Sequence, residues 1–128
     1  MSGPRKSMEL FKAHREFMTL DMNEGWTVPP GYPEGIEEKI LSGRLDEKAR
    51  CGSRTRLLRF QPGAFSTAPF VHEYWEEVLL ISGDLIVGAG DNAQPFLPHT
   101  YACRPPGVVH GPFKSELGCL LVEVHYFD

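Results

Sequence analysis

Two imidazoles and one carboxylate stand at spacings that suit a divalent metal site. His72 and Glu76 lie four residues apart at the start of an apolar run, and His110 follows a Pro105-Pro106-Gly107 turn. In an extended chain alternate residues share a face, so His72 and Glu76 can point into one cavity. Two histidines and a carboxylate hold Fe(II), Mn, Ni or Zn and leave positions open for a substrate and dioxygen. These three side chains are therefore the predicted metal ligands.

Other side chains near these motifs could complete or tune the site. Tyr74 shares the parity of Glu76, which makes it a candidate general acid or donor to a substrate oxygen. Tyr74 is also an alternative ligand, as are Glu123 and His125 of the last apolar segment. For His125, packing in the core or at an interface is the favoured interpretation. Glu77 has the opposite parity to Glu76 and is expected to be solvated or hydrogen-bonded.

Arginines on or beside the apolar segments offer a positive charge to the same cavity. Arg56, Arg59 and Arg104 are the candidates, and Arg104 lies directly before the proline turn. A guanidinium in the cavity could pair with a substrate oxyanion. A buried arginine that balances Glu76 or Glu123 is an equally good interpretation.

Composition limits the classes of function. Seventeen acidic and thirteen basic residues give a net charge of −4, so a nucleic-acid or anionic-membrane surface is not expected. No apolar run approaches the roughly 20 residues of a membrane span, and residues 1–6 are not followed by the apolar core of a signal peptide, so we expect a cytoplasmic location. Cys51, Cys103 and Cys119 are widely spaced and predict thiols rather than a disulfide framework.

The elements that must position the site are short strands. Thirteen glycines and eleven prolines divide the 128 residues into short pieces, which is typical of one all-β domain. Turns are predicted at 43–46, 61–63 and 88–92, and a tight hairpin at 82–84. Residues 8–15 are expected to form a short helix or a peripheral arm, and residues 26–35 an extended loop. The predicted strands span residues 36–42, 55–60, 75–81, 85–87, 100–104 and 119–127.

The paired motifs resemble those of the cupins. Pro62-Gly63, then His72, Glu76 and Gly83, match the first cupin motif in type and spacing, and residues 105–110 match Pro-x-Gly-x-x-His of the second. Two positions depart from the pattern. Phe70 stands where cupins have the first histidine of the motif, and Lys114 stands where they often have asparagine. The wording of residues 76–79 and 101–113 is most similar to the branch with zinc-dependent anti-sigma factors and acetylacetone-cleaving dioxygenases.

The resemblance implies a fold and a set of activities. It implies an all-β, double-stranded β-helix (jelly-roll) barrel over residues 35–128, with residues 1–34 as an N-terminal arm and loop packed on it. It also implies a homodimer and a metal-dependent enzyme, with Fe(II) favoured and Zn, Ni or Mn as alternatives. Its substrate would be a small diketone or hydroxyketone, cleaved by dioxygenase chemistry. The alternatives are an isomerase, cyclase or lyase, a metal- or ligand-sensing module, and a metal-free barrel around Phe70.

Overall fold

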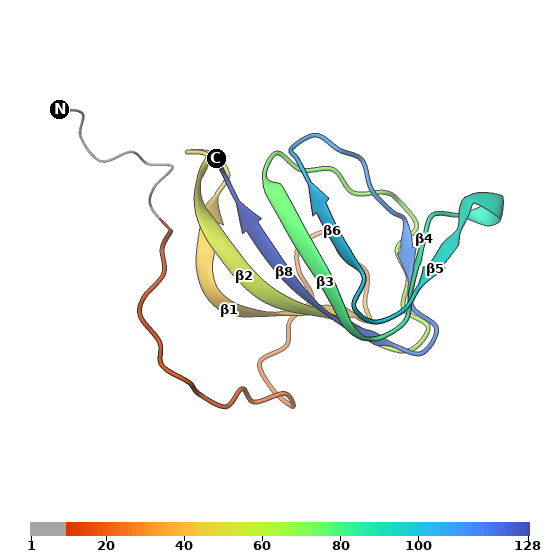
Figure 1. Cartoon of the computed structure of the whole chain (residues 1–128), viewed down its shortest axis with the longest axis horizontal. Coiled ribbons are helices and arrows are strands. Elements are labelled where there is room, and N and C mark those ends of the chain that lie inside the picture. Colours follow the sequence, from red (N-terminus) through yellow and green to blue (C-terminus); the bar gives the residue numbers. More distant parts are fainter. Residues whose placement is uncertain (1–9) are drawn as a thin grey trace.

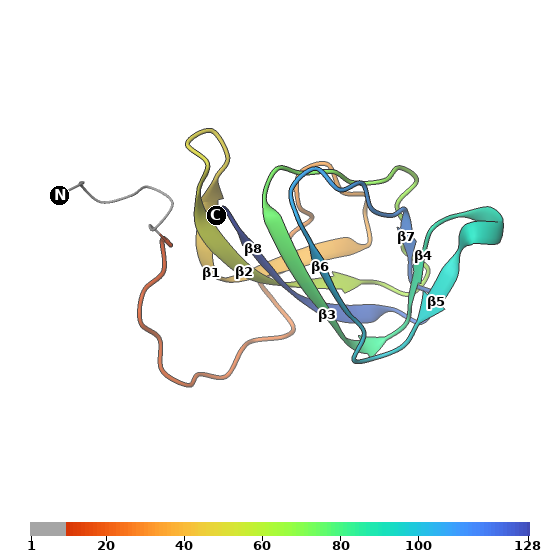
Figure 2. The same cartoon turned by 45° about the horizontal axis from the view of Figure 1, so that its top comes forward.

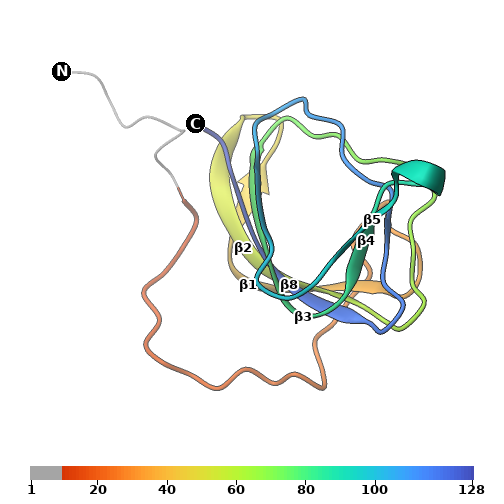
Figure 3. The same ribbon diagram turned by 45° about the vertical axis from the view of Figure 1, so that its right-hand side comes forward.

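The computed structural model describes residues 10–128, which form two antiparallel sheets that face each other across an interior (Figures 1, 2 and 3). The five-stranded sheet has the order β1 (Ile36–Asp46), β2 (Cys51–Phe60), β8 (Cys119–Tyr126), β3 (Trp75–Gly83) and β6 (Tyr101–Arg104). The three-stranded sheet has the order β5 (Gln94–Phe96), β4 (Leu85–Val87) and β7 (Phe113–Lys114). A single turn of 3₁₀ helix, Gly90–Asn92, precedes β5. The predicted all-β class is confirmed.

Alternation along the strands explains which face each residue takes. In β8, Cys119, Leu121, Glu123 and His125 are buried, and the residues between them are half-buried. Two of the four inward positions are therefore polar, which a purely apolar core would not contain. The apolar core gathers at the other end of the same strands, around Ile36, Leu58, Phe60, Leu80, Leu85, Cys119 and Leu121.

All six predicted strands are present, but two predicted turns are wrong. Residues 43–46 continue β1, where Gly43 pairs with Arg54 after a bulge between Ile40 and Ser42. Gly43 is needed there for close approach, because a Cβ would lie 1.9 Å from the carbonyl oxygen of Ser53. The glycine therefore marks a close contact between two paired strands and not a reversal of the chain.

The predicted hairpin at 82–84 is a corner between the two sheets. β3 ends at Gly83 and β4 begins at Leu85, yet the two strands belong to different sheets. Asp84 holds the corner: its carboxylate accepts hydrogen bonds from the Ser115 hydroxyl and from the backbone N–H of Leu117 at 3.0 and 2.9 Å. These bonds lower the pKa of Asp84 more than burial raises it. Strands β5 and β7 were missed: β5 has a proline at its centre, which is unusual in a strand, and β7 is only two residues long.

Residues 10–35 run outside the two sheets before the chain enters β1 (Figure 1). Residues 10–15 form no helix, and the rest of the predicted helix, residues 8 and 9, lies outside the described residues. Thr27 forms an isolated bridge with Glu38 of β1, and the Arg59 guanidinium stacks 4.0 Å from the ring centre of Trp26. Within residues 10–128, no helix is long and apolar enough to cross a membrane.

Candidate metal centre

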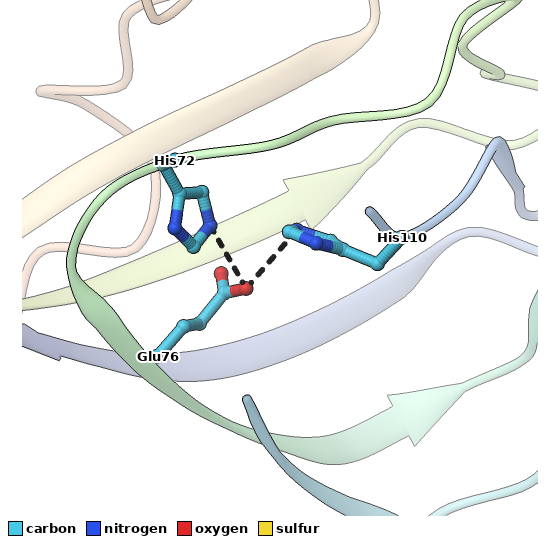
Figure 4. A group of neighbouring side chains, drawn as sticks. All are labelled: His72, Glu76 and His110. Carbon is cyan, nitrogen blue, oxygen red and sulfur yellow. Dashed lines mark hydrogen bonds and ion pairs between the residues drawn. The ribbon is translucent and has the colours of Figure 1, made fainter. Parts of the chain in front are cut away.

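The three predicted ligands meet inside the molecule (Figure 4). Glu76 belongs to β3, His72 lies in the segment that precedes this strand, and His110 lies before β7. The Nε2 atoms of His72 and His110 are 3.3 and 3.2 Å from the same oxygen, Oε2 of Glu76. One ligand atom from each residue lies within 4.8 Å of the others.

The outer nitrogen of each imidazole faces a backbone carbonyl. Nδ1 of His72 is 3.2 Å from the Tyr74 oxygen, and Nδ1 of His110 is 3.0 Å from the Val108 oxygen. A carbonyl only accepts, so each Nδ1 carries the proton and donates it. Both Nε2 atoms then present a lone pair to Glu76, unless a second proton sits on the ring. Metal-binding histidines show this arrangement, with one nitrogen donating to a carbonyl and the other on the metal. The donor set fits a divalent cation.

Glu76 is ionised although it is buried. Its side chain is 6% exposed, and burial alone would raise its pKa. The imidazoles of His110, His125 and His72 outweigh burial and hold the pKa of Glu76 well below its ordinary value. His125 donates as a neutral ring, whereas His72 and His110 donate to this carboxylate only when both of their ring nitrogens carry a proton. Arg104 adds a contact at 3.3 Å from Oε2. The carboxylate is therefore available as an anionic ligand.

Glu76, Glu123 and His125 form a second cluster of possible metal ligands, but the tautomer of His125 does not suit metal binding. Nε2 of the fully buried His125 lies 3.2 Å from both Glu76 Oε1 and Glu123 Oε1. Nδ1 of His125 accepts from the Arg54 guanidinium, at 2.8 and 3.1 Å. Because an arginine only donates, the His125 proton lies on Nε2 and is shared between the two carboxylates. His125 orients Glu76 rather than binding the cation, in agreement with its expected place in the core.

Arg56 balances the buried charge of Glu123. Its Nε and Nη2 atoms donate to Glu123 Oε1 at 2.9 and 2.7 Å, and Nη1 donates to Glu38 at 2.8 Å. Burial would raise the pKa of Glu123, but the Arg56 charge lowers it below its ordinary value. Tyr32 accepts a further bond from Arg56 at 3.0 Å, and burial raises the pKa of Tyr32 to about 12. From the sequence, an arginine could pair with a substrate oxyanion or balance a buried carboxylate, and Arg56 does the second.

Arg104 and Tyr74, the predicted catalytic residues, occupy different positions. Arg104 lines the cavity, and its guanidinium lies 3.3 Å from Glu76 Oε2. Tyr74 is buried and stacks on the His72 ring, with ring centres 4.0 Å apart and planes parallel within 1°. Burial raises the pKa of Tyr74. β3 begins only at Trp75, so the regular alternation assumed for residues 72–76 does not hold.

Phe70 lies beside His110, where the cupin pattern places a histidine. The two residues form an antiparallel bridge with N–H···O distances of 2.7 and 2.9 Å. The Phe70 ring lines the cavity, with its centre 6.3 Å from that of His110. It stacks on Tyr32 at 4.8 Å. The apolar ring thus forms one wall of the cavity beside the candidate ligands.

Several residues considered from the sequence lie away from the centre. Glu77 accepts hydrogen bonds from Tyr101 and Tyr126 on the outer face of the sheet. Arg59 pairs with Glu37 at 3.0 Å, also away from the cavity. Two aromatic residues near the motifs, Phe65 and Tyr101, are 52% and 57% exposed and lie outside the core. The side chains of His14 and His99 are exposed, and among the cysteines only Cys103 is.

Comparison with known proteins gives the architecture a name. No protein-family model and no curated protein matches the sequence. An RmlC-like cupin from Shewanella frigidimarina superposes with a TM-score of 0.65 at 14% identity, covering 93% of this chain and 96% of its own. The chain has the cupin fold. An acetylacetone dioxygenase from Acinetobacter johnsonii shares this fold at 17% identity and TM-score 0.66, with 98% and 80% covered.

Proteins of this fold whose names give a different activity are about as similar to the chain. A sugar phosphate isomerase of the cupin superfamily from Silicibacter pomeroyi has 20% identity and a TM-score of 0.61, with 87% of this chain and 76% of that chain covered. At such identities the likeness establishes the fold alone, and one cupin fold supports many reactions. The chemistry of this chain has to be argued from its own side chains.

The buried ion pairs around the centre generate a stability prediction. Arg56→Met should lower the free energy of unfolding by about 3–5 kcal/mol, because Glu123 would keep a buried charge without its partner. Arg59→Met is the matched control: its pair with Glu37 is partly exposed and should cost about 1 kcal/mol or less. Urea unfolding followed by circular dichroism measures both. Equal losses in the two variants would contradict the assigned role of Arg56.

Proposed function

We propose that this cupin is a metal-dependent enzyme in which His72, Glu76 and His110 hold a divalent cation, with Fe(II) favoured and Zn, Ni or Mn as alternatives. The observation that carries the proposal is the convergence of three lone-pair atoms on one point, with both imidazole protons turned away to backbone carbonyls. Lone pairs at these distances repel one another unless a cation or additional protons lie between them. A bound cation would polarise a chelating substrate and, if it is iron, bring dioxygen beside it.

The reaction we propose is dioxygenase-type oxidative cleavage of a small diketone or hydroxyketone. Two histidines and one carboxylate leave room for a substrate with two neighbouring oxygens. Arg104 lies where it can donate to a negatively charged substrate oxygen. Tyr74 as general acid or hydrogen-bond donor stays a prediction, and its stacking supports a further role in holding the His72 ring.

Two other functions use the same site. Isomerase, cyclase or lyase chemistry needs the cation only as a Lewis acid, and the cupin neighbours include a sugar phosphate isomerase. A sensing module would bind the metal without turnover. A metal-free barrel is the remaining alternative, and metal content separates it from all the others. The expectation of a cytoplasmic location stays a prediction.

Metal content is the first test of this proposal. Untagged protein should carry about one divalent ion per chain, measured by element-resolved mass spectrometry. His110→Ala and Glu76→Gln should each lower metal affinity at least tenfold, roughly the loss seen when even an outer partner of a metal ligand is removed. His99→Ala, a change at an exposed histidine, is the control and should retain the metal. Unchanged occupancy in either site variant would refute the ligand assignment.

Turnover then separates an enzyme from a sensor. The metal-loaded protein is incubated with a panel of diketones and hydroxyketones under oxygen, and oxygen uptake and cleavage products are measured. Consumption that disappears in His110→Ala supports the dioxygenase. Isomerised products without oxygen uptake favour the Lewis-acid alternative, and a loaded protein that turns over no substrate favours a sensor.

The position of Phe70 allows a gain-of-ligand test. Phe70→His should tighten metal binding by about tenfold or more, equivalent to ~1.4 kcal/mol, by adding an imidazole beside His110. Phe70→Leu is the control, because it removes the ring without adding a ligand. Competition with a chromogenic chelator gives the affinities. Weaker binding in Phe70→His than in Phe70→Leu would show that position 70 does not face the cation.

We also propose a homodimer that uses the N-terminal arm. Phe17 is fully exposed and Met18 is 58% exposed, and neighbouring exposed apolar side chains can form part of an interface between proteins. Sedimentation velocity should show a dimer, and Phe17→Ser should shift it towards monomer. A monomeric wild-type protein would remove this proposal without affecting the metal centre.

A further inference from the structure

The cavity that reaches the metal centre changes from polar at one end to apolar at the other. Paired residues on β2, β8, β3 and β6 form rows that face the interior. The row at the metal end is Arg54, His125, Glu76 and Arg104. The next row is Arg56, Glu123, Val78 and Ala102, and the last is Leu58, Leu121 and Leu80. The number of charged side chains therefore falls from one row to the next through the interior.

The three-stranded sheet closes the cavity with an apolar wall. Leu85, Val87 and Phe96 line it from strands β4 and β5, whereas Phe113 of β7 lies nearer the metal end, with its ring centre 5.9 Å from that of His110. The end remote from Glu76 is thus apolar on both sheets, and a ligand placed there would exchange water for hydrocarbon contacts. Such a floor favours an alkyl or aryl group over a sugar ring, whose hydroxyls would lose hydrogen bonds.

Size and charge narrow the ligand further. The cavity volume is about 200 Å³. That equals the share of roughly seven water molecules in the liquid, so the ligand has on the order of ten non-hydrogen atoms or fewer. Among the described residues that line this cavity, Arg104 is the only arginine or lysine, and it already contacts Glu76. A phosphate dianion would lack the cluster of basic side chains that such groups require.

We propose that this site takes a small amphipathic ligand, with an oxygen-chelating head of at most one negative charge and a short alkyl or aryl tail. The head lies between the metal and Arg104, and the tail contacts Leu58, Leu80 and Leu121. The inference rests on the proposed function, since the cation places the head. The metal centre selects only the head of the ligand. The apolar end of the cavity selects among ligands by the length and shape of their tails.

A series of hydroxamates tests the tail, because the chelating head stays constant while the chain grows. Zn(II)-loaded protein is titrated calorimetrically with acetohydroxamate, butanohydroxamate, hexanohydroxamate and benzohydroxamate. Each methylene should tighten binding by roughly fourfold until the floor is reached. Glucose 6-phosphate should bind more weakly than any of them. Affinities that do not change with chain length, or preferential binding of the sugar phosphate, would overturn the inference.

Two neighbouring positions on β6 provide a matched pair of variants. Ala102 faces the cavity opposite Val78, and Cys103 is exposed on the other face of the strand. Ala102→Leu should obstruct the path to the floor and cost hexanohydroxamate on the order of tenfold, the value of about two buried methylenes. Cys103→Leu adds the same side chain outside and should leave the series intact. A full chain-length effect in Ala102→Leu would contradict the proposed tail position.

Metal-free protein distinguishes failure of this inference from failure of the proposed function. Hexanoate is added to protein with ¹³C-labelled leucine methyl groups, and the shifts of Leu58, Leu80 and Leu121 are followed by NMR. If the protein binds no metal but these methyl groups shift, the apolar subsite is supported and the proposed metal-dependent enzyme is rejected. A protein that binds metal but shows neither methyl shifts nor a chain-length effect would reject the subsite alone.

Discussion

One buried carboxylate organises the interior of this cupin-fold protein. Glu76 is 6% exposed, and a charge placed so far from water is costly unless every side of it is matched. His72, His110 and Arg104 surround Oε2, and His125 donates to Oε1. These partners come from four separate segments of the chain, so the carboxylate is stable only when the whole fold is assembled.

The need to pair each buried charged or polar side chain extends beyond Glu76 to a network of basic and acidic residues. His125 accepts from Arg54, and Glu123 is neutralised by Arg56, which continues to Glu38 on the edge strand β1. This network also defines register. A slip of one residue in β3 would bring Glu77 inward and turn Glu76 out, and every inward charge would lose its partner. Stability and ligand geometry therefore depend on the same cross-strand pairs.

The arrangement also divides the cavity by function. Charged residues gather where the paired strands approach His72 and His110, and leucines occupy the opposite end. In a low-dielectric interior such a charged cluster acts strongly on whatever group is placed beside it. The cupin fold supplies two facing sheets to many proteins, and the identities of these inward residues distinguish one chemistry from another.

The sequence by itself determined six of the eight strands, the cupin motifs and the three candidate ligands, because each is encoded locally by alternation, turn residues and spacing. It also marked Phe70 as a departure from the motif. The roles of Arg54, Arg56 and His125 were decided only by the tertiary structure, since each depends on a partner about 50 to 70 residues away in the chain. The corner at Asp84 and the strand at Gly43 were decided in the same way. A glycine signals the need for an unusual backbone or a close approach, and only the packed sheets show which of the two it serves.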